Sequence, residues 1–448
     1  MRNFRRWQVQ LLCAIGVVAA VTVAGAAAPQ DWFRTGTGLG VEKARVAVAD
    51  FVTGNAGAEP LSQLFTETVR ADLAYSGILD LVSKSFQPSA APGSPQAIDA
   101  SQWTAPPASA QFVAYGTLTA TGNTLAVAGY LNDVRNPTAP PALGKRYPGA
   151  VTNEDVRRLA HQFADDIVMR LSGGVPGIAS TRIAFVSDRS GNKEIWLMDY
   201  DGQNQTQLTN QRTIAVTPRW SPDASRIAYT CFGEPRAPSA QICMYSMELG
   251  RKVAFAHFGG TNASPSWSPD GTKLMFMSSA AGPPNIYQSD ASGGNLKRMT
   301  TSSGPDTSPV WNPKTGQRVV FVSGRGGLPQ LYAMNSDGTD SEKLDLPDMG
   351  YVVDPDWSPN GQLLAFSWRR PDGNFDIYAM DIASRKLVQL TRDAGRNEKP
   401  SWAPDGRHLV FQSARTGKWQ IWTMLADGTE ARQLTKEGHN ESPNWSPK

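Results

Sequence analysis

The sequence predicts an α/β N-terminal domain followed by an all-β, six-bladed β-propeller. A tryptophan followed two residues later by a proline recurs six times in the second half of the chain, helical patterns are confined to the first half, and the last repeat is left incomplete at the C-terminus. The six copies begin at Trp220, Trp267, Trp311, Trp357, Trp402 and Trp445, and successive tryptophans lie 47, 44, 46, 45 and 43 residues apart. A signature with this period is typical of a repeat architecture in which each unit buries its apolar face against its neighbours.

The first 28 residues (1–28) are predicted to be a cleaved signal peptide. Arginines near the start give a positive region, Leu11 to Val23 form an uncharged apolar run, and small residues follow as far as Ala28. The run is short for a membrane span, so we expect an exported protein with no direct membrane insertion. The Arg5-Arg6 pair leaves both the general secretory and the twin-arginine export routes open.

Residues 29–43 are predicted to form a flexible arm, because they contain three glycines and little periodic apolar content. Residues 44–177 then predict a small α/β domain. Strands are expected at residues 44–51, 78–82, 112–118 and 125–131. Helices are expected over residues 61–73, ended by Gly77, and from Thr152 or Asn153 to Gly173, because apolar residues recur on one face of each.

Residues 178–448 are predicted to form the propeller. From Arg182 to Lys448 the chain has 267 residues, which is six units of about 44, the length of a four-stranded blade. Each unit contains two apolar strands, a turn such as Asp201-Gly202, a short outer strand and a Pro-x-Trp inner strand. The first unit lacks its inner strand and the chain ends with an unpaired one, Pro443 to Trp445. We therefore expect the C-terminus to complete the first blade and close the ring.

Composition excludes several classes of function. A formal charge of +3 without a basic run argues against nucleic-acid binding and against a polybasic membrane patch. After the signal peptide two cysteines remain, Cys231 and Cys243, and they can face each other across a predicted hairpin. An exported location favours a disulfide between them, and two unrelated buried cysteines are the alternative.

Candidate catalytic and metal-binding groups have structural explanations in the sequence. The tryptophans are expected to fill the seams between blades, because the same residue recurs at the same position. Asp223, Asp270 and Asp405 lie within repeated turns and are expected to accept hydrogen bonds from local amides. The four histidines show no metal-ligand spacing, and no nucleophile elbow or phosphate loop occurs. The sequence therefore predicts no catalytic residue, no metal and no cofactor.

The chain resembles the TolB family, the periplasmic components of the Tol–Pal envelope system, over nearly its whole length. The resemblance rests on the signal peptide, on Ser76 to Leu79 after a helix, on Thr181 to Val186 at the start of the blades, on the turn from Tyr200 to Gln205, and on the end of the chain from Pro443 to Pro447. It implies a periplasmic, non-catalytic scaffold or adaptor that maintains outer-membrane integrity and assists constriction during cell division.

Two partners are implied by this resemblance. One is the peptidoglycan-associated lipoprotein Pal, bound on one propeller face. The other is TolA, an inner-membrane-linked protein, engaged by the N-terminal arm, where Trp32 and Phe33 are suitable anchors for strand addition. Loops that precede the inner strands converge around the channel of a propeller, and such loops commonly carry binding residues. By position, the Pal face comprises Thr261, Asn262, Ser264, Thr307, Ser308, Asp354, Glu398, Lys399 and Glu441.

Two other functions stay open at this point. An exported propeller enzyme acting on saccharides or peptides would need histidines or carboxylates that break the repeat symmetry within the channel. A receptor would hold a small ligand in the same place.

Overall fold

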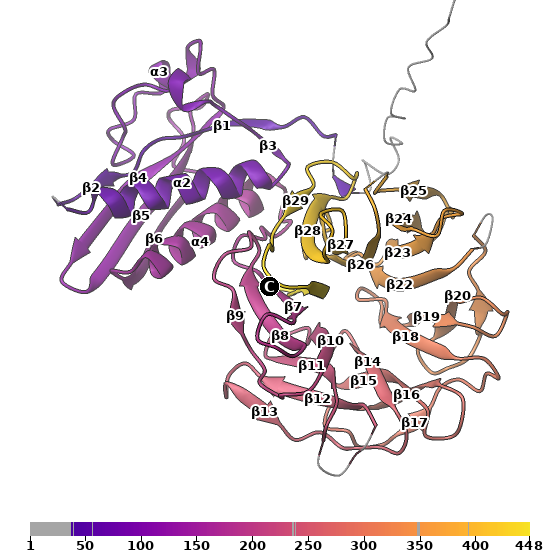
Figure 1. Ribbon diagram of the computed structural model, residues 1–448. Helices are drawn as coiled ribbons and strands as arrows, with labels where there is room; N and C mark the ends of the chain where they lie inside the picture. Colours follow the sequence, from indigo (N-terminus) through magenta and orange to yellow (C-terminus); the bar gives the residue numbers. More distant parts are fainter. Residues whose placement is uncertain are drawn as a thin grey trace, which may run out of the picture.

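The computed structural model describes residues 37–38, 40–55, 57–234, 237, 239–346, 350–392 and 394–448. Its N-terminal α/β domain lies beside a ring of six four-stranded sheets (Figure 1). The predicted fold class is confirmed. The signal peptide and the arm residues Trp32 and Phe33 lie outside the described residues. Among the helices in the described ranges, none is both long and apolar enough to cross a membrane.

One mixed sheet forms the centre of the N-terminal domain. Its strands are β1 (Ala44–Val48), β2 (Val52–Thr53), β3 (Leu79–Leu81), β4 (Phe112–Thr121), β5 (Thr124–Asp133) and β6 (Leu143–Ala150). The order is β3-β1-β4-β5-β6, with β2 beside β4. β1 runs parallel to β3 and β4, and β4, β5 and β6 are antiparallel. The sequence does not predict β6, because its residues do not alternate in polarity and include Pro148, which an edge strand tolerates.

Two amphipathic helices, α2 (Glu59–Tyr75) and α4 (Asn153–Leu171), cover one face of this sheet. Val46 and Val48 pack with the helices, whereas the alternate residues Ala47 and Ala49 pack beneath Trp103 on the other face. Trp103 belongs to the short helix α3 (Ala100–Thr104), and the 3-10 turn η1 (Lys84–Phe86) precedes it. The expected start of the second helix is correct, because the Thr152 hydroxyl accepts a hydrogen bond from the Asp155 amide at 3.1 Å.

The six blades have one architecture, in which each sheet runs from an inner strand at the channel to a short outer strand. From inside outward, blade 1 has β30 (Asn440–Trp445), β7 (Arg182–Ser187), β8 (Glu194–Asp199) and β9 (Thr206–Gln207); blade 2 has β10 (Ala215–Trp220), β11 (Arg226–Cys231), β12 (Gln241–Ser246) and β13 (Arg251–Val253); and blade 3 has β14 (Asn262–Trp267), β15 (Lys273–Ser278), β16 (Asn285–Asp290) and β17 (Lys297–Arg298). Blade 4 has β18 (Asp306–Trp311), β19 (Arg318–Ser323), β20 (Gln330–Asn335) and β21 (Glu342–Lys343); blade 5 has β22 (Val352–Trp357), β23 (Leu363–Arg369), β24 (Phe375–Asp381) and β25 (Leu387–Gln389); and blade 6 has β26 (Asn397–Trp402), β27 (His408–Ser413), β28 (Gln420–Leu425) and β29 (Arg432–Gln433).

The C-terminal strand closes the ring as the repeat arithmetic predicts. β30 pairs antiparallel with β7, and Trp445 lies opposite Ile183. The Ser446 amide donates to the Arg182 carbonyl at 2.8 Å, and the Trp445 indole donates to the Thr181 hydroxyl at 2.7 Å. Without β30, the edge of β7 would be left with unpaired backbone groups.

The two domains share one hydrophobic core at blades 1 and 6. Two buried histidines connect them. His161 Nδ1 lies 2.7 Å from Asp72 Oδ2, and the other oxygen of this carboxylate, Oδ1, accepts a hydrogen bond from the Tyr200 hydroxyl of blade 1. His408 of blade 6 lies 2.8 Å from the Tyr75 carbonyl at the end of α2. The N-terminal domain is therefore fixed against the ring on the side where each inner strand ends in its tryptophan.

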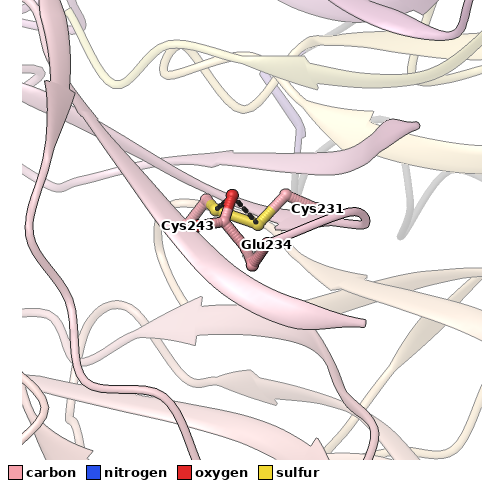
Figure 2. A group of neighbouring side chains, drawn as sticks. All are labelled: Cys231, Glu234 and Cys243. Atoms are coloured by element: carbon pink, nitrogen blue, oxygen red, sulfur yellow. Dashed lines mark hydrogen bonds between the residues drawn. A yellow bond between two sulfur atoms is a disulfide. The ribbon is translucent and has the colours of Figure 1, made fainter. Parts of the chain in front are cut away.

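A disulfide between Cys231 and Cys243 joins β11 to β12 in blade 2. Figure 2 shows Glu234 beside the bonded sulfur atoms, which lie 3.8 and 3.6 Å from its Oε1. The same place in blades 1, 4 and 6 holds an arginine stacked on an aromatic ring. These pairs are Arg189 on Trp196, Arg325 on Tyr332 and Arg415 on Trp422, at 4.6, 4.7 and 4.4 Å. Cys243 lies opposite Tyr229 in the strand pairing, just as Trp196 lies opposite Phe185, so Cys243 and Trp196 occupy equivalent positions. In blade 2 the disulfide therefore stands where blades 1, 4 and 6 have an arginine–aromatic contact.

We expect reduction of this disulfide to lower the free energy of unfolding by about 3 kcal/mol, because it closes a short loop whose freedom in the unfolded chain then returns. Urea denaturation with and without a dithiol reductant measures the difference. The double variant Cys231→Ser/Cys243→Ser is the control and should not respond to reductant. Equal stability of the native protein in both conditions would contradict the expectation.

The ring closure gives a second prediction. Replacement of Trp445 by alanine should lower the free energy of unfolding by about 3–5 kcal/mol, because it empties a buried indole site at the junction of β30, β7 and the N-terminal domain. Lys448→Ala, which changes an exposed residue three positions later, should leave the urea midpoint unchanged. If the two variants behave alike, the C-terminal strand does not close the fold.

Candidate functional site

A ring of strained residues forms a neck on the propeller axis. Each inner strand has a break in register immediately before its proline. The residue at that position has φ between 49° and 55°, in the left-handed region that non-glycine residues rarely adopt. The six neck residues are Thr217, Ser264, Ser308, Asp354, Lys399 and Ser442. Together with five of the prolines that follow them and with Arg219, they line a narrow hollow of about 50 Å³.

Side chains of the adjacent blade hold this strained backbone in place. The amide of Ser264 donates to the Thr230 hydroxyl at 3.1 Å, and the amide of Lys399 donates to the Ser367 hydroxyl at 3.0 Å. The Ser442 amide likewise donates to Gln412 at 2.8 Å. Such a conformation costs about 1–3 kcal/mol per residue and persists only where the surroundings fix it. The neck is therefore a rigid platform.

The backbone of the neck has six-fold symmetry, but its side chains do not. Four are small hydroxyl residues, whereas Asp354 and Lys399 in blades 5 and 6 are charged. The predicted residues Ser264, Ser308, Asp354 and Lys399 all lie in the neck. Sequence reasoning missed Thr217 and Ser442, although the residue before the proline of each Pro-x-Trp would have identified them.

Three more of the predicted residues lie one position before the neck. Thr307 is partly buried beside Ser308. Glu441 pairs with Lys193 at 2.5 Å, and Glu398 pairs with Arg396 at 2.6 Å. Partial burial raises the pKa of Glu398, and its hydrogen bond to Arg396 opposes that rise. These two ion pairs lie beside the neck on the adjacent blades 1 and 6.

Thr261 and Asn262 have different positions. Thr261 is partly buried in the loop before β14, where its carbonyl accepts a hydrogen bond from the Ser279 amide. Asn262 is fully buried, and its amide group donates to Gln241 and to the carbonyls of the loop from Phe258 to Gly260. Because this side chain is used inside the blade, Asn262 positions the loop and is not available to a partner.

Polar side chains block the channel beyond the neck. They belong to the middle residue of the Pro-x-Trp sequence in three blades, Arg219, Asp356 and Asn444, and we call this group the polar plug. Here Arg219 of blade 2 pairs with Asp356 of blade 5 at 3.4 Å, and these blades are opposite each other in the ring. Asp356 also accepts a hydrogen bond from the Trp402 amide at 2.8 Å. Asn444 accepts one from the Trp220 amide at 2.8 Å. The plug separates the neck from a hollow of about 410 Å³ that is lined mainly by the repeated tryptophans and prolines.

The turn aspartates and the histidines have the structural roles expected of them. Asp223 accepts hydrogen bonds from Ser221 and Ser225, which lower the pKa of this carboxyl to about 2. His161 and His408 lie at the domain junction described above.

Within the described ranges, one group of His, Cys, Asp and Glu side chains is close enough to share a metal ion, namely Cys231, Glu234 and Cys243. Its two sulfur atoms are already joined in the disulfide.

Comparisons with known proteins agree with this layout. The chain matches the TolB amino-terminal domain over residues 37–139, and the TolB beta propeller domain over residues 170–352 and 348–448. It is 33% identical over 422 residues to the Tol-Pal system protein TolB of Bordetella pertussis, covering 92% of this chain and 90% of that protein. The Bordetella bronchiseptica protein of the same name is also 33% identical, with 92% and 89% covered.

A solved structure supports the same relationship in three dimensions. The crystal structure of TolB from Acinetobacter baumannii superposes with a TM-score of 0.76 and 27% sequence identity. The match covers 91% of this chain and 97% of that chain, so it includes both domains.

The plug makes a pH-dependent prediction. Burial raises the pKa of Asp356 to about 6, and Arg219 only partly offsets it. The folded chain therefore holds this proton more tightly than the unfolded chain, where an aspartate titrates near pH 4. The resulting stabilisation is present below pH 4 and is lost as the pH rises through about 6.

Asp356→Asn lacks this titration. Relative to the variant, the native protein should lose about 2 kcal/mol of unfolding free energy between pH 4 and pH 7.5. Urea denaturation of both proteins at the two pH values measures this loss. A difference that stays constant would show that attraction to Arg219 cancels the effect of burial on the pKa of Asp356, and one that changes in the other direction would show that it outweighs burial; either result contradicts the prediction.

Proposed function

Because this chain belongs to the TolB family, we propose that it is a non-catalytic, periplasmic component of a Tol-Pal system that binds a Pal-like lipoprotein through the loop face of its propeller. The loop face is the end of the ring that carries the neck. On this proposal the protein supports outer-membrane integrity and constriction during cell division. The main support for this proposal is the neck. Its rigid, six-fold backbone presents one negative side chain, Asp354, and one positive side chain, Lys399.

The physical argument for binding is preorganisation. A partner that docks on the neck meets backbone already fixed by bonds to the adjacent blades, so little conformational entropy is lost there on association. Neither Asp354 nor Lys399 has an ion-pair partner within 4 Å among the described residues. Charges of this kind are suited to complementary contacts that set register and association rate.

The arm is proposed to engage a TolA-like, inner-membrane-linked protein. The described part of the arm enters a hollow of about 570 Å³ between the two domains, where Thr37 is buried. Pro404 and Arg407 of blade 6 line the same hollow. The described residues of the arm therefore lie at the domain junction, on the other side of the ring from the neck. The two proposed partners would not compete for one surface.

The alternative is an exported propeller enzyme that acts on saccharides or peptides. Sites for small molecules commonly have volumes of about 300–1,000 Å³. The hollow in the neck is about 50 Å³. The larger hollow beyond the plug has one carboxylate, Asp356, which is bound by Arg219 and the Trp402 amide. This arrangement favours binding over catalysis.

Calorimetric titration with the purified soluble domain of the Pal-like lipoprotein from the same organism tests the proposal. Asp354→Ala and Lys399→Ala should each weaken binding about 10-fold, because each removes a charged contact at the centre of the interface. Lys314→Ala, an exposed lysine on the opposite side of the ring, is the control. If the native protein does not bind the lipoprotein and instead turns over a glycan or peptide, the binding proposal is wrong and the protein is an exported propeller enzyme.

A further inference from the structure

A second recognition site lies off the axis of the loop face, between blades 5 and 6. Loops from the two blades surround an open hollow of about 470 Å³. Its wall includes the neck residues Asp354 and Lys399, so it is continuous with the proposed binding surface. Two arginines and two aromatic residues of the wall carry the argument below, namely Arg369, Arg396, Tyr351 and Phe375. We refer to this hollow as the arginine groove.

The arginine groove combines stacked aromatic rings with guanidinium groups. Tyr351 and Phe375 pack edge to face with ring centroids 5.6 Å apart. The Arg396 guanidinium lies 5.7 Å from the Phe375 ring and 5.4 Å from the Trp419 ring, so it bridges blades 5 and 6. Tyrosine, tryptophan and arginine are the residue types enriched at the energetic centres of protein interfaces.

The other blades do not repeat this arrangement. In every blade an amide at or just after the end of the second strand donates to a carbonyl just before the inner strand, which identifies equivalent positions. In blade 5 this pair is Arg369 and Tyr351, and in blade 6 it is Ala414 and Arg396. The pairs in blades 1 to 4 are Asp188 and His439, Phe232 and Ile214, Ser279 and Thr261, and Gly324 and Pro305. The combination of arginines with aromatic rings at these positions is therefore specific to blades 5 and 6. The other blades pack without it, so the blade fold does not require it.

The charges of the groove indicate the chemistry of its occupant. Arg396 is neutralised by Glu398, which also accepts a hydrogen bond from Gln412. Arg369 is exposed, and its only described hydrogen bond from the side chain is a long one to the Gly373 carbonyl at 3.4 Å. Lys399 adds a second cation without an ion pair among the described residues, and it faces one unpaired carboxylate, Asp354, since Glu398 is paired with Arg396. The groove thus offers a cationic surface next to aromatic rings.

We propose that the arginine groove binds a carboxylate-bearing segment of the protein partner that docks on the loop face. Arg369 and Lys399 contact the carboxylate, and the ring of Tyr351 packs against an apolar part of the same segment. A guanidinium binds a carboxylate through two parallel hydrogen bonds, which lysine cannot reproduce. This inference rests on the proposed function, because it takes the loop face as the surface that partners use.

The test is the affinity for the soluble domain of the Pal-like lipoprotein, measured over a series of salt concentrations. Arg369→Gln should weaken binding about 10-fold and reduce the dependence of affinity on salt, because it removes one charge contact. Arg369→Lys should recover only part of the affinity, because it restores the charge without the planar donor pair. Tyr351→Ala should weaken binding without altering the salt dependence.

Arg212→Gln is the matched control, since it removes an exposed arginine from the loop before the inner strand of blade 2. Its affinity should match that of the native protein, and thermal unfolding should show that all variants fold. Native-like affinity of Arg369→Gln and Tyr351→Ala, alongside weakened Asp354→Ala, would overturn the inference and leave the proposed function in place. If the native protein itself does not bind the lipoprotein domain, the proposed function fails and the inference fails with it.

Discussion

The pairing of β30 with β7 is the interaction on which the rest of the structure depends. It joins residues more than 250 positions apart and turns a row of six sheets into a closed ring. Closure brings the six inner strands around one axis, and only then do their strained positions form a neck. The same strand places Trp445 in the core that the ring shares with the N-terminal domain. One pairing therefore determines the shape of the ring, the geometry of the neck and the attachment of the second domain.

Residues that recur in the blades of the ring have a structural role, whereas residues found in one or two blades are candidates for recognition. The tryptophans, the turn aspartates and the left-handed neck backbone recur around the ring, and contacts within or between blades account for them. Asp354, Lys399, Arg369 and Arg396 occur in blades 5 and 6 without counterparts elsewhere. Packing does not explain them, because the neighbouring blade 4 forms the same strands with serine, glycine and proline at the equivalent positions. Departures from the repeat are thus the best guide to recognition in this fold.

The sequence was sufficient for the propeller because its signals are periodic, whereas β6 of the N-terminal domain was missed because it has no alternating pattern. The tryptophan spacing predicted the number of blades, and the unpaired Pro443 to Trp445 predicted how the ring closes. The candidate site was only partly predictable. Residue position placed Ser264, Ser308, Asp354 and Lys399 at the neck, but nothing in the pattern indicated that Asn262 turns inward to bond the loop before β14. The arginine groove was missed because Tyr351, Arg369, Phe375, Arg396 and Trp419 come from five separate positions in the loops and strand ends of two blades, and no local spacing connects them.

Hydrogen–deuterium exchange of the protein, alone and saturated with the Pal-like lipoprotein domain, tests the central claim most directly. The account predicts slower exchange in the segments 350–354, 369–375 and 396–399, which contain the charged neck residues and the arginine groove. The turns that follow each Pro-x-Trp, on the opposite side of the ring, should exchange as they do in the free protein. Slowing confined to those turns, or to the N-terminal domain, with the three segments unchanged, would contradict the account.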